Sequence, residues 1–206
     1  MGQDPNESAR LQPLSATEDA SLAPIFEMSK KSLGFVPNSL LILQRRPEIM
    51  KAFSQLTASL WGPSSKVDAG LKRLVAFVAS RAAGCQYCMA HTAGGAMHLG
   101  VSEEKVAAVW DYQHSEHFSP AERAALDLAV GAGSVPNAVT DDMFVAMRKY
   151  WSEEQIVEIV ATLAVFGFLN RWNDTMGTPL EDEPTDVGEK LLAKHGWTPG
   201  KHGRRS

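Results

Sequence analysis

The 206-residue sequence lacks a long hydrophobic run and an excess of positive charge. No window reaches the ~18 consecutive apolar residues that a membrane-spanning helix needs, and the N-terminal residues show no basic start followed by an apolar stretch. We therefore expect a cytoplasmic protein with no membrane partner. Lys and Arg total 20 against 24 Asp and Glu, so the formal charge of -4 gives no general attraction to nucleic acid.

Cysteine is also scarce, because Cys85 and Cys88 are the two that the chain contains. Two cysteines cannot build a disulfide scaffold, and a close pair in a reducing compartment is more often reactive or metal-binding than structural. The hydrophobic share of 44% and charged share of 21% are those of an ordinary globular chain that can bury a core. The search for function therefore starts at the two cysteines.

Apolar residues recur at helical spacing, and no stretch alternates as a strand would, so the sequence predicts an all-α fold. Ser119-Pro120-Ala121-Glu122 and Ser152-Glu153-Glu154-Gln155 have the pattern of capped helix starts. The segment from Asn170 to Asp174 is expected to follow the most buried helix, where the chain turns. The expected helices cover Ser15 or Thr17 to Leu33, Ser39 to Gln44, Pro47 to Trp61, Asp68 to Ala83, Gln86 to Leu99, a short one from Ser102, Pro120 to about Val130, Thr140 to Tyr150 or Trp151, and one from Ser152 through Phe168.

The chain is expected to form one domain. Both ends are polar and contain proline or glycine, which is typical of segments with little fixed structure. We expect a flexible N-terminal segment over residues 1–14, a single helical domain over 15–195 and a flexible C-terminal tail over 196–206. Neither end is expected to carry chemistry.

Cys85-Gln86-Tyr87-Cys88 lies between the helix stop Gly84 and a following helical stretch. This position places Cys85 near a helix N-terminus, where unpaired N–H groups and the helix dipole stabilise a thiolate. Two thiols at this spacing can also close into a disulfide and so exchange two electrons. The pattern indicates redox or other thiolate chemistry, and the structural alternative is a pair of small buried hydrophobic residues.

His91 follows Cys88 by three residues and shares its helical face. It could ionise a thiol or protonate a leaving group, or it could simply pack. Thr92 lies on the same face, and the Tyr87 hydroxyl could bind a substrate. Outside this segment, Arg81, Arg171 and Glu158 are candidates for charged groups near the thiols, with Glu158 unusual in an apolar helix.

The main alternative to redox chemistry at this segment is zinc binding, with Cys85, Cys88 and His91 as possible ligands and His98 as a conceivable fourth. His98 lies seven residues beyond His91, about 10.5 Å along a helix, which is too far for both to share one ion. A fourth ligand would have to come from elsewhere. The candidates for it are His114 and His117. Because the chain has no second C-x-x-C pair, we expect no metal site.

The segment Gly84-Cys85-Gln86-Tyr87-Cys88-Met89-Ala90-His91-Thr92-Ala93 resembles the carboxymuconolactone decarboxylase superfamily, specifically its alkyl hydroperoxidase D (AhpD)-like, peroxidase-related members. Residues 71–81, 33–38 and 170–171 are similar to other segments of such proteins, so the resemblance spans about residues 20 to 185. It implies an AhpD-like all-helical fold, a C-x-x-C redox centre without flavin, haem or metal, and assembly into homo-oligomers. Members of the AhpD type reduce hydroperoxides through the paired thiols, and a dithiol donor restores them.

Two positions depart from that pattern. The family has a Glu twelve residues before the first cysteine and a His four residues after the second, which form a proton relay, and this sequence has Arg73 and Thr92 there. His91 is our candidate for the missing histidine, and Glu158 is a guess for the missing glutamate. The decarboxylase members lack the redox pair, which disfavours lactone decarboxylation.

The sequence thus predicts an alkyl hydroperoxidase or peroxiredoxin-type oxidoreductase with Cys85, Cys88 and His91 as catalytic residues and no cofactor. Its expected partners are a hydroperoxide substrate, a dithiol protein or small-molecule reductant, and further copies of the chain. The helix start favours Cys85 as the attacking thiol, whereas proximity to His91 favours Cys88. The alternative is a non-catalytic helical oligomer that senses oxidation or binds a partner through the same cysteines.

Overall fold

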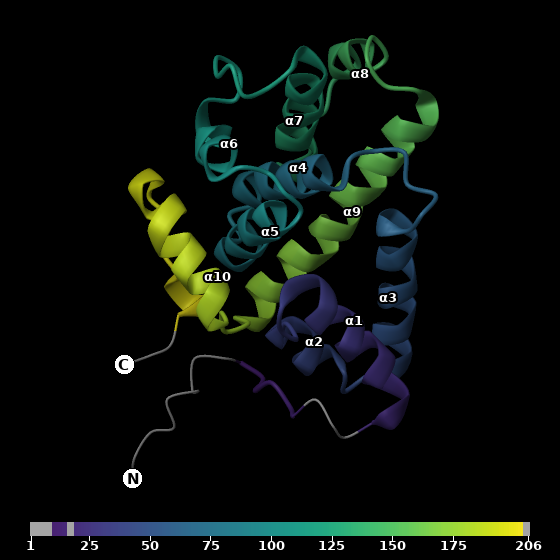
Figure 1. Cartoon of the computed structure of the whole chain (residues 1–206), viewed down its shortest axis with the longest axis vertical. Helices are drawn as coiled ribbons and strands as arrows, with labels where there is room; N and C mark the ends of the chain where they lie inside the picture. The colour runs from purple at the N-terminus through teal and green to yellow at the C-terminus, as the bar shows by residue number, and fades with distance from the viewer. Residues whose placement is uncertain (1–9, 16–18, 204–206) are drawn as a thin grey trace.

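The computed structural model describes residues 10–15 and 19–203, and this part of the chain contains helices and no β-strand (Figure 1). The predicted all-α class is confirmed. Most of the expected N-terminal segment 1–14 and the last residues of the expected tail, 204–206, lie outside the described residues. The α-helices are α1 (Ala23–Leu33), α2 (Asn38–Leu43), α3 (Pro47–Trp61), α4 (Ala69–Ala82), α5 (Gln86–His98), α6 (Glu103–Ala107), α7 (Pro120–Gly133), α8 (Asp141–Met147), α9 (Glu153–Met176) and α10 (Asp182–Val187).

Local capping signals determine where most helices begin. The Ser119 hydroxyl accepts the backbone N–H of Glu122 at the start of α7, and Ser152 accepts that of Gln155 at the start of α9. Both are the reciprocal capping boxes that the sequence predicts. Glycine ends the helix α1. Gly34 has a φ of 83°, in the left-handed region of the backbone that glycine adopts without strain.

The first helix begins later than expected. α1 starts at Ala23 after a 3₁₀ turn, Ala20–Leu22, that the Asp19 side chain caps. Pro24 explains the difference, because proline has no N–H and is tolerated only in the first helical turn. Ser15 is not helical, and Thr17 lies outside the described residues.

α4 lies at the centre of the larger core and packs against α5, α7 and α9 (Figure 1). Its residues from Val75 to Val78 are completely buried. α7 approaches so closely that a Cβ on Gly133 would lie 2.5 Å from the Ala79 carbonyl oxygen. This packing holds the end of α4, and therefore the start of the cysteine segment, in one position.

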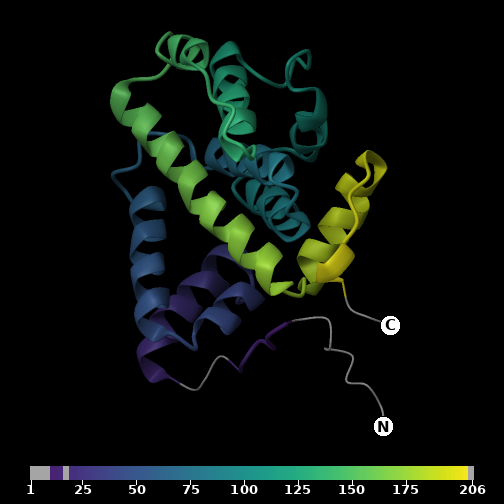
Figure 2. The ribbon, with the colours of Figure 1, turned by 180° about the vertical axis from the view of Figure 1, so that it is seen from behind.

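The long helix α9 runs diagonally across the molecule and contacts α3, α4, α5 and α7 (Figure 2). It continues to Met176, so the expected turn at Asn170 to Asp174 is wrong. Asn170 and Asn173 are buried there, which extends the internal face of the helix with polar side chains rather than apolar ones. A helix prediction based on apolar periodicity therefore ends too early, at the point where polar residues replace apolar ones on the buried face.

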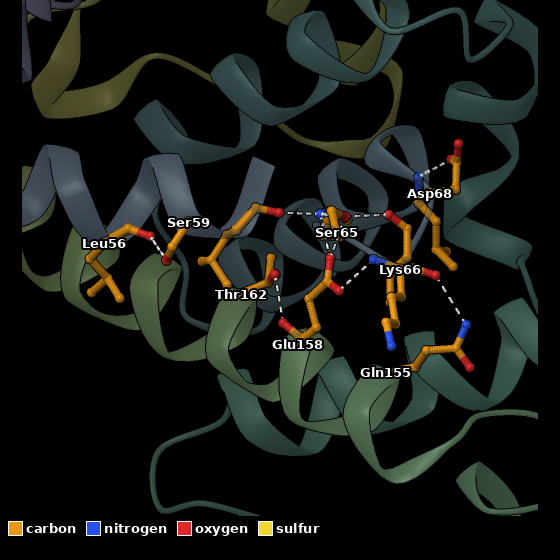
Figure 3. A network of polar contacts seen from close by, with 12 residues as sticks. Leu56, Ser59, Ser65, Lys66, Asp68, Gln155, Glu158 and Thr162 are labelled. Atoms are coloured by element: carbon orange, nitrogen blue, oxygen red, sulfur yellow. Dashed lines mark hydrogen bonds and ion pairs between the residues drawn. The ribbon is translucent and has the colours of Figure 1, made fainter. Parts of the chain in front are cut away.

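A buried ion pair joins α4 to the beginning of α9. Lys72 Nζ lies 2.6 Å from Glu158 Oε1 and 2.6 Å from Ser65 Oγ, and it also donates to the Leu60 carbonyl. Figure 3 shows Glu158 facing Ser65 and Lys66 of the α3–α4 connection. Glu158 lies fifteen positions, about 22 Å of helix, before Asn173, which is beside the cysteines. Glu158 therefore does not replace the relay glutamate, and that guess is wrong.

The chain after α10 folds back against α5. A π-helical turn (Gly188–Leu192) and two 3₁₀ turns (Ala193–His195 and Gly200–His202) lead to residue 203. Trp197 is 3% exposed and donates its Nε1–H to the Gln86 carbonyl at 3.0 Å, and His202 is 1% exposed. We expected residues 196–206 to be flexible and without chemistry, but the structure packs Trp197 and His202 beside the cysteine segment.

Candidate functional site

Cys85 is the residue that caps the N-terminus of α5. Its Sγ accepts the backbone N–H of Cys88 at 3.4 Å, and its own N–H donates to the Ser80 carbonyl at 3.0 Å. Gly84, with a φ of 76°, makes the sharp turn between α4 and α5. The prediction that Cys85 lies at a helix N-terminus is confirmed. A negative charge on its sulfur is favoured by the N–H groups and dipole of α5.

Cys88 lies in the first turn of the same helix, and both cysteines are free thiols with at most 2% exposure. The Asn173 amide of α9 donates to Cys88 Sγ at 3.5 Å. Burial, followed by the neighbouring Cys85 sulfur, raises the pKa of Cys88 well above its usual value, and Asn173 opposes this only in part. Its surroundings therefore favour the protonated form of Cys88.

His91 is held by a carboxylate that the sequence analysis missed. Its Nε2 lies 2.7 Å from Oε2 of Glu181, and its ring stacks on Tyr87 with centroids 4.2 Å apart. Burial alone would raise the pKa of Glu181, but His91 and the N–H of Asn38 outweigh it and hold the pKa below its usual range. Glu181 precedes α10 and lies 90 positions from His91, so no local spacing could have indicated the pair.

Tyr87 completes this group. Its hydroxyl donates to Glu181 Oε1 at 2.9 Å and accepts the Ser39 N–H at 3.4 Å. Burial and the nearby carboxylate raise the pKa of Tyr87 well above its usual value, so the hydroxyl keeps its proton. The hydroxyl, the carboxylate and the imidazole form one connected network, whose α5 members Tyr87 and His91 lie one residue before and three residues after Cys88.

A second set of polar groups surrounds Cys85. One ligand atom from each of Cys85, Asp174 and His202 lies within 4.8 Å of the other two. His202 Nε2 is 3.6 Å from Asp174 Oδ1, and Nδ1 lies 2.8 Å from the Thr178 carbonyl oxygen. Within residues 10–15 and 19–203, these three residues form a group that could hold a metal ion. Asp174 and His202 escaped the sequence analysis because α9 and the C-terminal turns bring them there from distant positions.

The other candidate residues lie in different surroundings. His98 pairs with Glu183 at 3.2 Å and His114 with Asp111 at 2.6 Å, so neither joins His91. Arg171 donates to the Gly167 carbonyl of its own helix, and the Arg81 guanidinium lies over the Trp110 ring, 5.8 Å from its centroid. His117, the other histidine considered as a metal ligand, is exposed.

The two positions that depart from the AhpD pattern have structural contacts instead. The Arg73 guanidinium lies over the Trp61 ring, 5.1 Å from its centroid, and burial of the charged group lowers its pKa to about 10. The Thr92 hydroxyl donates to the Cys88 carbonyl at 2.6 Å, within α5. Neither side chain supplies the carboxylate or the imidazole of the family relay.

A cavity of about 200 Å³ adjoins the cysteine site on the α9 side. Its wall includes Ala79, Gly133, Asn170 and Asp174, so Asp174 borders both the cavity and Cys85. Asn170 is 4% exposed, and its Oδ1 has no hydrogen-bond partner within the described part of the chain.

Across residues 10–15 and 19–203, no helix has the length and apolar character needed to cross a membrane.

A model of the carboxymuconolactone decarboxylase family matches residues 47–130. The crystal structure of the debrominase Bmp8 is 33% identical, with a TM-score of 0.83 over 87% of this chain and 96% of that one. A cysteine-to-alanine variant of Bmp8 has been solved in complex with 2,3,4-tribromopyrrole. An uncharacterised peroxidase-related protein of Ralstonia eutropha, described as an alkylhydroperoxidase AhpD core, shares the fold at 23% identity and a TM-score of 0.74, over 85% of this chain and 94% of that one.

The chain therefore belongs to the carboxymuconolactone decarboxylase family, and its fold is that of the AhpD-like members. Among proteins compared by sequence, the uncharacterised YdfG of Bacillus subtilis is 25% identical over 62% of this chain and 84% of that protein. The resemblance seen in the cysteine segment is thus confirmed.

Proposed function

We propose that the protein is a dithiol oxidoreductase that reduces hydroperoxides through a Cys85–Cys88 disulfide cycle. The observation that carries the proposal is the placement of Cys85 Sγ at the N-terminus of α5, where the N–H of Cys88 points at it. The N–H groups and dipole of α5 stabilise negative charge at that position, whereas burial raises the pKa of Cys88. Cys85 is therefore the attacking residue and Cys88 the resolving one.

The reaction consumes one hydroperoxide and two thiols. The Cys85 thiolate attacks the terminal peroxide oxygen, the O–O bond breaks, and the leaving alkoxide takes a proton to become an alcohol. Cys88 then attacks the sulfenic acid formed on Cys85, which releases water and leaves a disulfide. An external dithiol restores both thiols and is itself oxidised to a disulfide.

His91 is proposed as the proton donor to the leaving oxygen. The Glu181 carboxylate fixes one imidazole nitrogen at 2.7 Å, and stacking on Tyr87 fixes the plane of the ring. A general acid must be oriented before it can act, and a carboxylate partner of this kind provides the orientation. Glu181 and Tyr87 are accordingly positioning residues.

A second candidate, reductive removal of a halogen, is favoured by the 33% identity to the debrominase Bmp8. The same thiols could supply its two electrons. Cys85 would take the bromine from a bromoaromatic ring, a proton would replace it on carbon, and Cys88 would displace bromide as the disulfide forms. Both reactions require the same residues, and they differ in the electrophile that the site accepts.

The test compares the two substrate classes on one enzyme. We would follow thiol loss in the reduced protein with cumene hydroperoxide and, separately, with a brominated pyrrole, and identify the products by mass spectrometry. Fast loss with the hydroperoxide and a Cys85–Cys88 disulfide supports the peroxidase. Bromide release without peroxide turnover selects the debrominase, and reaction with neither leaves a redox-sensing or partner-binding protein.

Single substitutions test the roles proposed for Cys85, Cys88 and His91. Cys85→Ser is expected to abolish turnover, and Cys88→Ser to stop it after one event with a sulfenic acid trapped on Cys85. His91→Gln should slow the reaction by about 100-fold, the usual contribution of a positioned acid. His98→Gln is the matched control, because His98 is a more exposed histidine on the same helix. Unchanged turnover in both cysteine variants would refute the proposal.

Assembly into homo-oligomers is part of the proposal. Val157, Val160 and Phe168 of α9 are 67%, 39% and 42% exposed. Apolar side chains that recur on one helix fit a contact with another copy of the chain. Light scattering of the purified protein checks this, and a monomeric mass would refute it.

A further inference from the structure

Three metal-binding side chains from separate parts of the chain meet at Cys85. Cys85 caps α5, Asp174 lies in the last turns of α9, and His202 belongs to the C-terminal 3₁₀ turn. Their ligand atoms lie within 4.8 Å of one another, with two of the residues buried and Asp174 partly so. A thiolate, an imidazole and a carboxylate are the three kinds of side chain that zinc sites use.

His202 is arranged as metal-bound histidines usually are. Its Nδ1 lies 2.8 Å from the Thr178 carbonyl, which accepts only from a protonated nitrogen, so Nε2 carries the free lone pair. Nε2 is buried and has no hydrogen-bond partner among the described residues. A backbone carbonyl on one nitrogen and an unused lone pair on the other are what a ligating imidazole requires.

The geometry of Asp174 agrees with a shared ion. Its Oδ1 is 3.6 Å from His202 Nε2, beyond a normal hydrogen bond. Two ligands bound at ~2.0–2.1 Å to one tetrahedral ion lie about 3.4 Å apart, close to this separation. The other oxygen, Oδ2, pairs with Lys201 at 2.7 Å, which gives the carboxylate an outer partner and a fixed direction.

We propose that the reduced protein binds one Zn²⁺ through Cys85 Sγ, an Asp174 carboxylate oxygen and His202 Nε2. Zinc is the ion that this mixed set of sulfur, nitrogen and oxygen ligands suits, and a site with three protein ligands leaves a fourth position for water. The zinc site differs from the one weighed on the sequence, because it uses neither His91 nor His98. The two ligands that join Cys85, namely Asp174 and His202, come from α9 and the C-terminal turn.

Zinc binding is linked to the redox state of the cysteines. A disulfide between Cys85 and Cys88 removes the thiolate ligand, so oxidation by a hydroperoxide releases the ion, and bound zinc keeps Cys85 from attacking. This link depends on the proposed dithiol cycle. The binding of zinc to the reduced protein does not depend on it.

The experiment titrates metal-free protein, reduced with a phosphine that does not chelate zinc, with Co²⁺ and then Zn²⁺. We expect one equivalent of Co²⁺ to give a thiolate-to-metal absorption band that Zn²⁺ abolishes. His202→Gln and Asp174→Asn should weaken binding by at least ~100-fold, since each removes a ligand and outer partners alone change affinity ~10–100-fold. His91→Gln is the matched control and should bind as the wild type does.

Circular dichroism of each variant shows whether it is folded. If the folded His202→Gln and Asp174→Asn variants bind Zn²⁺ as tightly as the wild type, the cysteines alone hold the ion and the proposal is wrong. Absence of binding by the reduced wild type would also refute it. A protein that binds zinc but turns over no peroxide would refute the proposed function and leave the zinc site standing.

Discussion

The two ends of α9 carry polar clusters that differ in how completely they are paired. At the beginning, Lys72 and Glu158 are satisfied by each other and by Ser65. At the other end, the buried side-chain atoms without a hydrogen-bond partner among the described residues include Asn170 Oδ1, Asn173 Oδ1 and His202 Nε2. Buried polar groups without partners are costly and uncommon. The paired cluster therefore stabilises the fold, and the incomplete one has groups available for chemistry.

The largest effect on stability is expected at the paired cluster. Glu158→Gln leaves Lys72, whose side chain is completely buried, without its counter-charge, which costs about 3–5 kcal/mol. Urea unfolding measures the change in the free energy of unfolding. Glu154→Gln is the control, because its pair with Lys66 is exposed and is worth only ~0–1 kcal/mol. Equal losses of unfolding free energy in the two variants would show that burial does not increase the contribution of the Lys72–Glu158 pair to stability.

The same pair should make stability depend on pH. Burial alone would raise the pKa of Glu158, but hydrogen bonds from Lys72, Ser65 and the Lys66 N–H hold it below its usual range. A lowered pKa in the folded state adds stability above the pKa of the unfolded chain. That stability is lost as the pH falls through the folded-state pKa. Unfolding at a series of pH values should show a shallower acid slope for Glu158→Gln than for the wild type.

A smaller loss is expected at Glu181. Glu181→Gln keeps the size of the side chain but removes the charge that receives His91 and Tyr87, and hydrogen bonds to charged groups contribute ~1.5–3 kcal/mol. Turnover should fall together with stability, because His91 loses its orientation. A variant that unfolds like the wild type and still loses activity would instead assign Glu181 a direct part in proton transfer.

The smallest change in stability is expected at Asn173. Its amide donates a weak hydrogen bond to Cys88 Sγ at 3.5 Å, so Asn173→Ala should cost about 1 kcal/mol. Asn173 opposes the raised pKa of Cys88, and its removal should slow disulfide closure. Mass spectrometry after one peroxide addition would then find more sulfenic acid on Cys85. An unchanged ratio of sulfenic acid to disulfide would show that Asn173 does not influence Cys88.

Local signals in the sequence predicted many of the helix starts and the position of Cys85. The serine caps at Ser119 and Ser152 and the thiol at the start of α5 depend on neighbours within four residues, and all three are confirmed. Glu181 and His202 could not be predicted in this way. Each meets its partner across about 90 positions or more of the chain, and only the packing of α9, α10 and the C-terminal turns sets those distances.

The docking of Trp197 and His202 also orders events during synthesis of the protein. His202 lies 117 positions after Cys85, so a nascent chain carries both thiols long before it carries the groups that surround Cys85. Until that segment emerges from the ribosome and docks, the two cysteines have neither the Trp197 contact at Gln86 nor the imidazole. The cysteine site therefore forms later than the helices that precede Trp197 in the chain, and substitutions that hinder this docking should leave the site incomplete.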